Sequence, residues 1–190
     1  MWNTDQYYET LDFAAAAHEG QTVPGKAYAF VVHLADICSE VLRAVIIENV
    51  EDPNLAMQCA LLHKVLEDTA VTYAILCDRF GQEVAEGVQA LTVNNELPEK
   101  KRHLDALHRI KQQKTEVWLV KLADAVTQLR DPPDFWGKDK RLAVMQEARA
   151  IRAALGKGSP YLSARLHDVL FYYKQHLVKT AQVKKPPRRR

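Results

Sequence analysis

Histidine and carboxylate side chains stand among apolar neighbours in separated segments of this sequence. His33 begins an apolar run, and His63 lies within ALLHKVLEDT, which also carries Glu67 and Asp68. Asp124 lies within VKLADAVTQLRD. Because an ionisable group is costly in apolar surroundings unless it is paired or bound, these positions are candidates for a ligand site.

The spacing after His63 suits a shared metal-binding face. On a helix, positions i, i+3 and i+4 lie on one side, so Glu67 and Asp68 can point toward the same place as His63 and Lys64. Imidazole nitrogens and carboxylate oxygens suit a borderline divalent ion such as Mn²⁺ or Zn²⁺, with open positions where water can become a nucleophile. From spacing alone, two ordinary alternatives remain, namely a core histidine and an i, i+4 ion pair.

Helices are expected to position these residues. The chain has only seven glycines, is rich in helix-forming residues, and shows no strand-like alternation of useful length. The patterns predict helices over residues 10–17, 33–48, 53–68, 72–80, 82–91, 100–113, 115–129, 139–155 and 160–178. The sequence therefore predicts an all-α fold, a single helical bundle of about eight to ten helices.

Length and composition indicate one globular domain with a basic tail. The 190 residues are 47% hydrophobic and 26% charged, and we expect a domain over 1–178 and a disordered tail over 179–190. The tail holds six basic residues, Lys179, Lys184, Lys185 and Arg188–Arg190. Without them the chain has 20 basic and 24 acidic residues. The formal charge of +2 is therefore no evidence for nucleic-acid binding, and we expect no nucleic-acid partner.

Other sequence features bear on location. No apolar run is long enough to cross a bilayer, so no membrane association is expected. The first residues are polar and acidic, unlike a signal peptide. Three cysteines without CxxC spacing suit buried thiols in a reducing compartment, and we expect a cytoplasmic protein.

Five motifs in series resemble one known family. They are AAxxHxGQ from Ala14, then His33, ALLHKVLEDT, FGQEVAEGVQALT from Phe80, and VKLADAVTQLRD. Over residues 10–136 the chain is similar to the RelA/SpoT-type small alarmone hydrolases, which belong to the HD-domain metal-dependent phosphohydrolases. The resemblance implies an all-α fold, bound manganese, and removal of the 3′-pyrophosphate from guanosine alarmones such as ppGpp.

The resemblance also implies roles for individual residues. His33, His63 and Asp124 match metal ligands, while Glu67 and Asp68 match the acidic pair that orients or activates the attacking water. Further positions correspond to the family's substrate-binding region, namely Lys101, Arg102 and Gln128, the last standing where the family has Asn. Lys121 would either support the site or meet phosphate. The role of His18 stays undecided between a contact at the site and a packing or capping contact at the end of a helix.

Lys64 departs from the family pattern. The resemblance predicts an Asp directly after the ligand histidine, and the chain has a lysine there. An ammonium about 4 Å from a divalent ion repels it by roughly 8 kcal/mol at an effective dielectric of about 20. Lys64 can avoid this repulsion by turning outward, by losing its proton, or by pairing with Glu67 and Asp68.

Further departures surround the expected nucleotide pocket. They are Ala29-Phe30, Ala125, Gln128 and the non-basic loop Thr22-Val23-Pro24. Two interpretations of function follow. The first is a metal-dependent phosphohydrolase that acts on a nucleotide phosphate or pyrophosphate and is impaired by Lys64. The alternative is a catalytically degenerate module that binds a phosphorylated nucleotide or a partner, and aromatic side chains in 160–178 leave a homodimer open.

Overall fold

The structure is a computed structural model that describes residues 1–183, except for the side chains of 99–100 and 176–183. The described part contains ten helices and no strand beyond one isolated bridge, so the predicted all-α fold is confirmed. The helices are α1 (Thr4–Ala17), α2 (Val31–Glu48), α3 (Pro53–Leu62), α4 (Val65–Asp68), α5 (Tyr73–Phe80), α6 (Gln82–Leu91), α7 (Glu99–Ile110), α8 (Thr115–Arg130), α9 (Lys138–Leu155) and α10 (Pro160–Val183).

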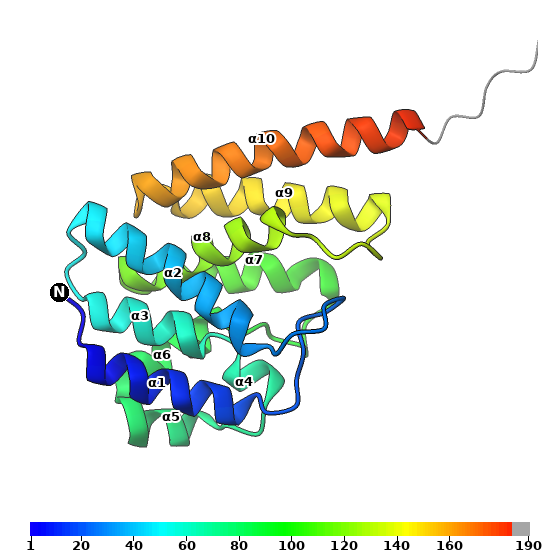
Figure 1. Ribbon diagram of the computed structural model, residues 1–190. Helices are drawn as coiled ribbons and strands as arrows, with labels where there is room; N and C mark the ends of the chain where they lie inside the picture. The colour runs from blue at the N-terminus through cyan, green and yellow to red at the C-terminus, as the bar shows by residue number, and fades with distance from the viewer. Residues whose placement is uncertain (184–190) are drawn as a thin grey trace, which may run out of the picture.

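The helices stack in layers around α3 and α8. Figure 1 shows α10 and α9 along one side, α2 and α8 beneath them, then α3, and finally α1 with α5 on the opposite side. The helix α8 packs against α2, α3, α9 and α10. This layering brings the start of α2, the end of α3 and the middle of α8 into one region.

The central position of α8 follows from its sequence. Nearly every side of the helix is apolar, and its buried residues include Val120, Leu122, Ala123 and Val126. A helix that is apolar nearly all round is stable only when other helices cover it. Lys121 and Asp124 interrupt this surface one turn apart, so the fold holds two opposite charges close to its core.

Two helix boundaries differ from the sequence prediction for identifiable reasons. The helix α1 begins at Thr4 because the Asn3 side chain accepts hydrogen bonds from two backbone N–H groups of the first turn. The predicted helix over 53–68 is broken at His63 and Lys64 into α3 and α4. There the His63 Nδ1 lies 2.8 Å from the Ala60 carbonyl, the acceptor that a continuous helix would pair with the Lys64 N–H.

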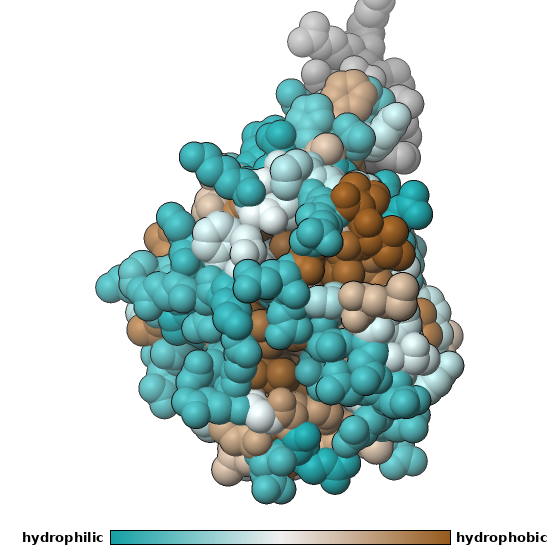
Figure 2. Space-filling view, turned by 90° about the vertical axis from the view of Figure 1, so that its left-hand side faces the viewer, coloured by the Kyte–Doolittle hydropathy of each residue, from teal (hydrophilic) through white to brown (hydrophobic). Residues whose placement is uncertain are grey.

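The helix α10 runs to Val183, past the domain boundary predicted at residue 178. The predicted tail beyond residue 183 lies outside the described residues. None of the described helices is long and apolar enough to cross a membrane. One face carries an apolar patch among polar side chains (Figure 2), and Ile46 and Ile47 near the end of α2 are exposed.

Candidate metal centre

Three helices bring together His33, His63 and Asp124. His33 lies in the first turn of α2, His63 directly follows α3, and Asp124 lies in the middle of α8. One donor atom from each of the three lies within 4.8 Å of the others. The two imidazole rings have centroids 5.7 Å apart. Residues far apart in the sequence therefore converge as the sequence predicted, while their role as ligands stays a prediction.

His63 presents an unpaired nitrogen to this cluster. Its ring is buried and its Nδ1 contacts the Ala60 carbonyl at 2.8 Å, so Nδ1 carries the hydrogen and Nε2 carries the free lone pair. Nε2 has no hydrogen-bond partner. Burial lowers the pKa of His63 to about 3; Asp124 opposes this shift and Lys64 adds to it. A neutral imidazole with an orphaned Nε2 is the form that binds a metal ion.

His33 is neutral for the same physical reason. Burial lowers its pKa, the charge of Asp124 opposes the shift, and the charge of Lys64 reinforces it. The ring lies between Phe30 and His63, with centroids 5.3 and 5.7 Å away. Two adjacent imidazoles that both resist protonation keep lone pairs available, and they can donate these lone pairs to a bound cation.

Asp124 supplies the carboxylate and is already paired. Its Oδ2 lies 3.1 Å from the Lys121 Nζ, and the two side chains are 17% and 18% exposed. Burial alone would raise the pKa of Asp124, but the positive charge of Lys121, reinforced by that of Lys64, outweighs burial and holds this pKa far below its usual value. The carboxyl is thus ionised and available as a ligand through its other oxygen.

Lys64 pairs with Glu67. The Nζ–Oε2 distance is 3.2 Å, and the side chains are 24% and 19% exposed. The same Glu67 oxygen also accepts the backbone N–H of Val93 at 3.3 Å. Of the three ways in which Lys64 could avoid repelling a metal ion, the structure shows ion pairing. Its described partner is Glu67 alone. Glu67 is therefore occupied by two donors.

Asp68 is placed differently from Glu67. No described hydrogen bond involves its carboxylate, whereas its backbone carbonyl accepts the Gln21 side-chain amide at 2.7 Å. Burial raises the pKa of Asp68, and Lys64 opposes the shift. A hollow of about 410 Å³ opens here, lined by Gln21, Thr22, Pro24, Phe30 and Asp68. Asp68 thus faces space that a ligand can enter.

His18 is connected to the site through a series of neighbouring, tilted rings. Its ring lies 4.7 Å from that of Phe30, which in turn contacts His33. Its Nδ1 pairs with the Gln21 side chain at 2.8 Å, and its buried Nε2 has no partner. Sequence reasoning treated Phe30 only as a departure from the family pattern. Its place three residues before His33 was the signal, because i and i+3 share a helix face.

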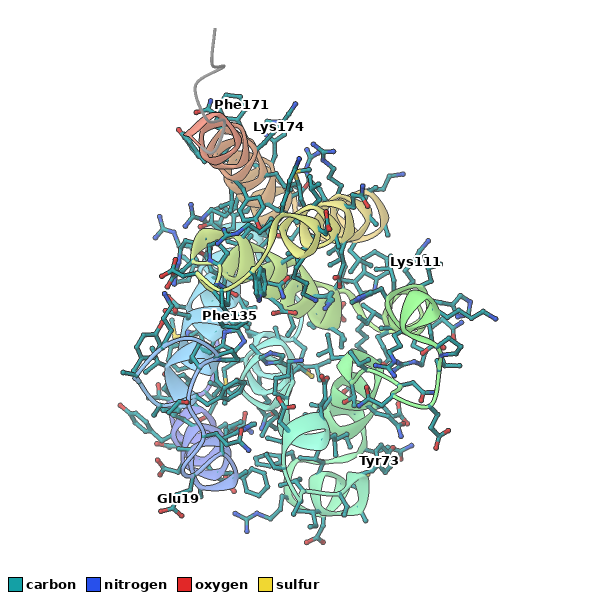
Figure 3. All side chains as sticks on the ribbon, turned by 90° about the vertical axis from the view of Figure 1, so that its right-hand side faces the viewer. Glu19, Tyr73, Lys111, Phe135, Phe171 and Lys174 are labelled. Carbon is teal, nitrogen blue, oxygen red and sulfur yellow. The ribbon has the colours of Figure 1, made fainter. Side chains whose placement is uncertain are left out.

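The loop between α1 and α2 forms the rim of this region. Lys26 pairs with Asp131 at 2.8 Å, so the loop is tied to the end of α8. Gly25 has φ of +78°, and a side chain there would meet the ring of Phe135 at 3.0 Å. Figure 3 shows Phe135 on the connection between α8 and α9. The left-handed backbone and the close ring both require glycine at this turn.

For three of the predicted substrate contacts, no described contact links the side chain to the three donors. The Arg102 guanidinium donates to the carbonyls of Leu97 and Asn95, so it holds the connection before α7. Lys101 and Gln128 are exposed, and no described contact links them to the cluster. By contrast, Lys121 supports the site directly through Asp124. The substrate roles of Lys101, Arg102 and Gln128 stay predictions.

The residues fit a divalent ion held by three protein ligands. Two neutral imidazoles and one carboxylate converge, and the buried Nε2 of His63 lacks any other partner. Such a set with open positions is typical of catalytic metal centres. Lys64 contributes no ligand atom and adds positive charge nearby.

Comparisons with known proteins agree with this fold. No protein-family model matches the chain. The zebrafish guanosine-3′,5′-bis(diphosphate) 3′-pyrophosphohydrolase MESH1 is 31% identical over 137 residues, which are 70% of this chain and 74% of the relative. The human protein of the same name is 27% identical over 179 residues, covering 92% and 93% of the two chains.

A solved structure has the same fold. It is described as a metazoan ortholog of SpoT that hydrolyzes ppGpp, and it superposes with a TM-score of 0.78 at 22% identity, covering 90% of this chain and 97% of that one. The fold and site define an HD-domain protein with a candidate metal centre. Within that class, the chain belongs to the MESH1 family of alarmone hydrolases. Divalent metal dependence is a property that the family implies.

Proposed function

We propose that this chain is a metal-dependent hydrolase that removes the 3′-pyrophosphate from guanosine 3′,5′-bis(diphosphate). The observation that carries the proposal is the convergence of donor atoms from His33, His63 and Asp124 within 4.8 Å. The printed activity of the MESH1 relatives supports the choice of substrate. This interpretation is favoured over a module that binds without cleaving.

His33, His63 and Asp124 would hold the ion, which we propose is Mn²⁺ because a mixed set of imidazole and carboxylate donors accommodates it. A bound divalent ion supplies polarisation of a phosphoryl oxygen and acidification of water. The ring nitrogens are already neutral, so binding requires no loss of protons from them. Lys121 keeps Asp124 ionised and oriented.

Asp68 is the group that we assign to proton transfer. Its carboxylate has no described partner, it lines the hollow, and its raised pKa makes it a better base than an ordinary aspartate. Glu67 is held by Lys64 and by the Val93 N–H, so we assign it a positioning role. In the balanced reaction, water adds to the phosphorus and the bond to the 3′-oxygen breaks. Asp68 accepts a proton of the water, and the leaving 3′-oxygen takes a proton, from Asp68 or from solvent, to become a hydroxyl.

The proposal is tested by incubating the full chain with guanosine 3′,5′-bis(diphosphate), with and without Mn²⁺, and following products by phosphorus NMR. We expect guanosine 5′-diphosphate and pyrophosphate only when Mn²⁺ is present. The matched variants are His33→Gln, which should stop the reaction, and His167→Gln, an exposed histidine of α10 that should not affect it. Tight nucleotide binding without turnover at any Mn²⁺ concentration would instead establish the degenerate module.

A further inference from the structure

Two lysines lie beside the three donor groups. Lys64 lies 3.2 Å from a Glu67 oxygen, and Lys121 lies 3.1 Å from an Asp124 oxygen. Both ammonium groups are largely buried, at 24% and 18% exposure. Lys64 directly follows His63 in the chain and Lys121 contacts Asp124, so each ammonium group is next to a donor residue. The site therefore contains two ammonium groups before any ion enters.

The charge balance is unfavourable for a bare divalent ion. The two imidazoles are neutral, and the only carboxylate among the three donors, Asp124, is already neutralised by Lys121. Glu67 likewise offsets Lys64. An entering ion adds two positive charges close to two ammonium groups, and repulsion of this kind weakens binding by at least about tenfold.

A phosphate anion would reverse this balance. Its oxygens can fill the open positions of a three-ligand ion and accept charge-assisted hydrogen bonds from an ammonium group. Lys64 can supply that bond because its carboxylate partner has the Val93 N–H as a second donor and is not left unpaired. The hollow lined by Asp68 also borders Phe30, whose ring neighbours that of His33.

We infer that Lys64 makes divalent-metal binding at His33, His63 and Asp124 depend on an adjoining phosphate group, so that the ion and the phosphate bind together. This inference rests on the metal site of the proposed function. Because coupling between two ligands is reciprocal, the ion must also tighten phosphate binding by the same factor. The lysine thereby selects for anionic, phosphate-bearing ligands whether or not they are cleaved.

The test measures the affinity of the full chain for Mn²⁺ from the free-ion EPR signal, with and without inorganic phosphate, which binds Mn²⁺ only weakly in solution. For the unmodified chain we expect phosphate to tighten Mn²⁺ binding by about tenfold or more. In Lys64→Met, Mn²⁺ alone should bind more tightly and the coupling should fall below about threefold. Lys64→Arg keeps the charge and should keep the coupling.

The control is Lys111→Met, which removes an exposed lysine at the end of α7 (Figure 3) and should leave both affinities unchanged. Should Lys64→Met fail to fold, comparison of Lys64→Gln with Lys64→Arg decides the same point. Equal Mn²⁺ affinity with and without phosphate, or undiminished coupling after the charge is removed, would overturn the inference. Absence of nucleotide hydrolysis would not, because the readout is binding and not turnover.

Discussion

The two ends of α2 differ in whether their polar side chains have hydrogen-bond partners. In the second half, Glu40 accepts two hydrogen bonds from Arg165, and Glu48 accepts bonds from Ser159 and from the Tyr161 N–H. In the first turn, His33 faces His63, whose Nε2 has no partner. Buried polar groups in folded proteins are normally satisfied, so one end of the helix holds the fold together and the other is built for a ligand.

The contrast also concerns the origin of the partners. Glu40 and Glu48 are satisfied by α10, an element more than 100 residues away, and they fasten the last helix to the bundle. Near His33, by contrast, Lys64 pairs with Glu67 and Lys121 pairs with Asp124, each pair within a single helical turn. Local pairs of this kind leave donor atoms free to meet an external ion.

The largest expected effect is at the ligand end. His33→Gln removes one of three donors, and we expect metal-dependent turnover to fall on the order of a thousandfold, since several kcal/mol of charge stabilisation depend on the ion. Because the His33 side chain makes no described hydrogen bond, thermal stability should change by less than about 1 kcal/mol. Steady-state kinetics and thermal melts of the same preparation check both statements. If His33→Gln retained metal-dependent turnover, the first turn of α2 would not be the ligand-binding end of the helix.

The next effect is at the structural end. Glu48→Ala leaves the start of α10 without its acceptor, and we expect a loss of about 2 kcal/mol of unfolding free energy, because bonds to charged groups are among the stronger ones. The melting temperature should drop by about 4–8 °C. Turnover measured well below the melting temperature should be unchanged. A parallel loss of kcat would mean that the two ends are coupled.

Acid should act mainly through His63. Its pKa is about 3 in the folded chain and 6.5 in the unfolded chain, so the unfolded state binds more protons between these values and stability falls as pH drops below 6.5. The slope should reach about 1.4 kcal/mol per pH unit, measured by melts with a chelator present. His63→Gln cannot take up this proton and should flatten the curve. An unchanged slope would assign acid unfolding to other groups.

The smallest effect is at the surface between the two regions. Arg130 pairs with Asp36 at 2.7 Å, but both side chains are more than 40% exposed. Arg130→Ala should change stability by less than about 1 kcal/mol, since exposed ion pairs contribute little. Chemical denaturation at low and high salt measures it. A larger effect would show that this pair supports the first turns of α2.

Much of this architecture was predictable because helical periodicity is a local signal. The helices around His33 and Asp124 follow from apolar residues at helical spacing, and the family motifs named the converging residues. The break after Leu62 was not predictable, because it depends on where the His63 ring finds an acceptor. The conformation of Lys64 could not be predicted from spacing either, because it depends on Glu67 and on Val93 from a distant segment.

Arg102 shows a different limit. In the sequence it stands in a basic run that matches a phosphate pocket, whereas its guanidinium is directed to the backbone carbonyls of Asn95 and Leu97. A charge run does not specify which of its members face a site. The role of His18 was left undecided for the same reason, and its ring contact with Phe30 depends on the turn that returns the chain to α2.

The most direct test of the metal centre is anomalous X-ray diffraction at the manganese edge from crystals grown with Mn²⁺ and phosphate. We expect one peak per chain, within bonding distance of His33, His63 and Asp124, with a phosphate oxygen beside it and Lys64 directed toward that oxygen. A peak elsewhere, or the Lys64 ammonium lying among the three donors in place of the ion, would contradict the assignment of this cluster as a metal site.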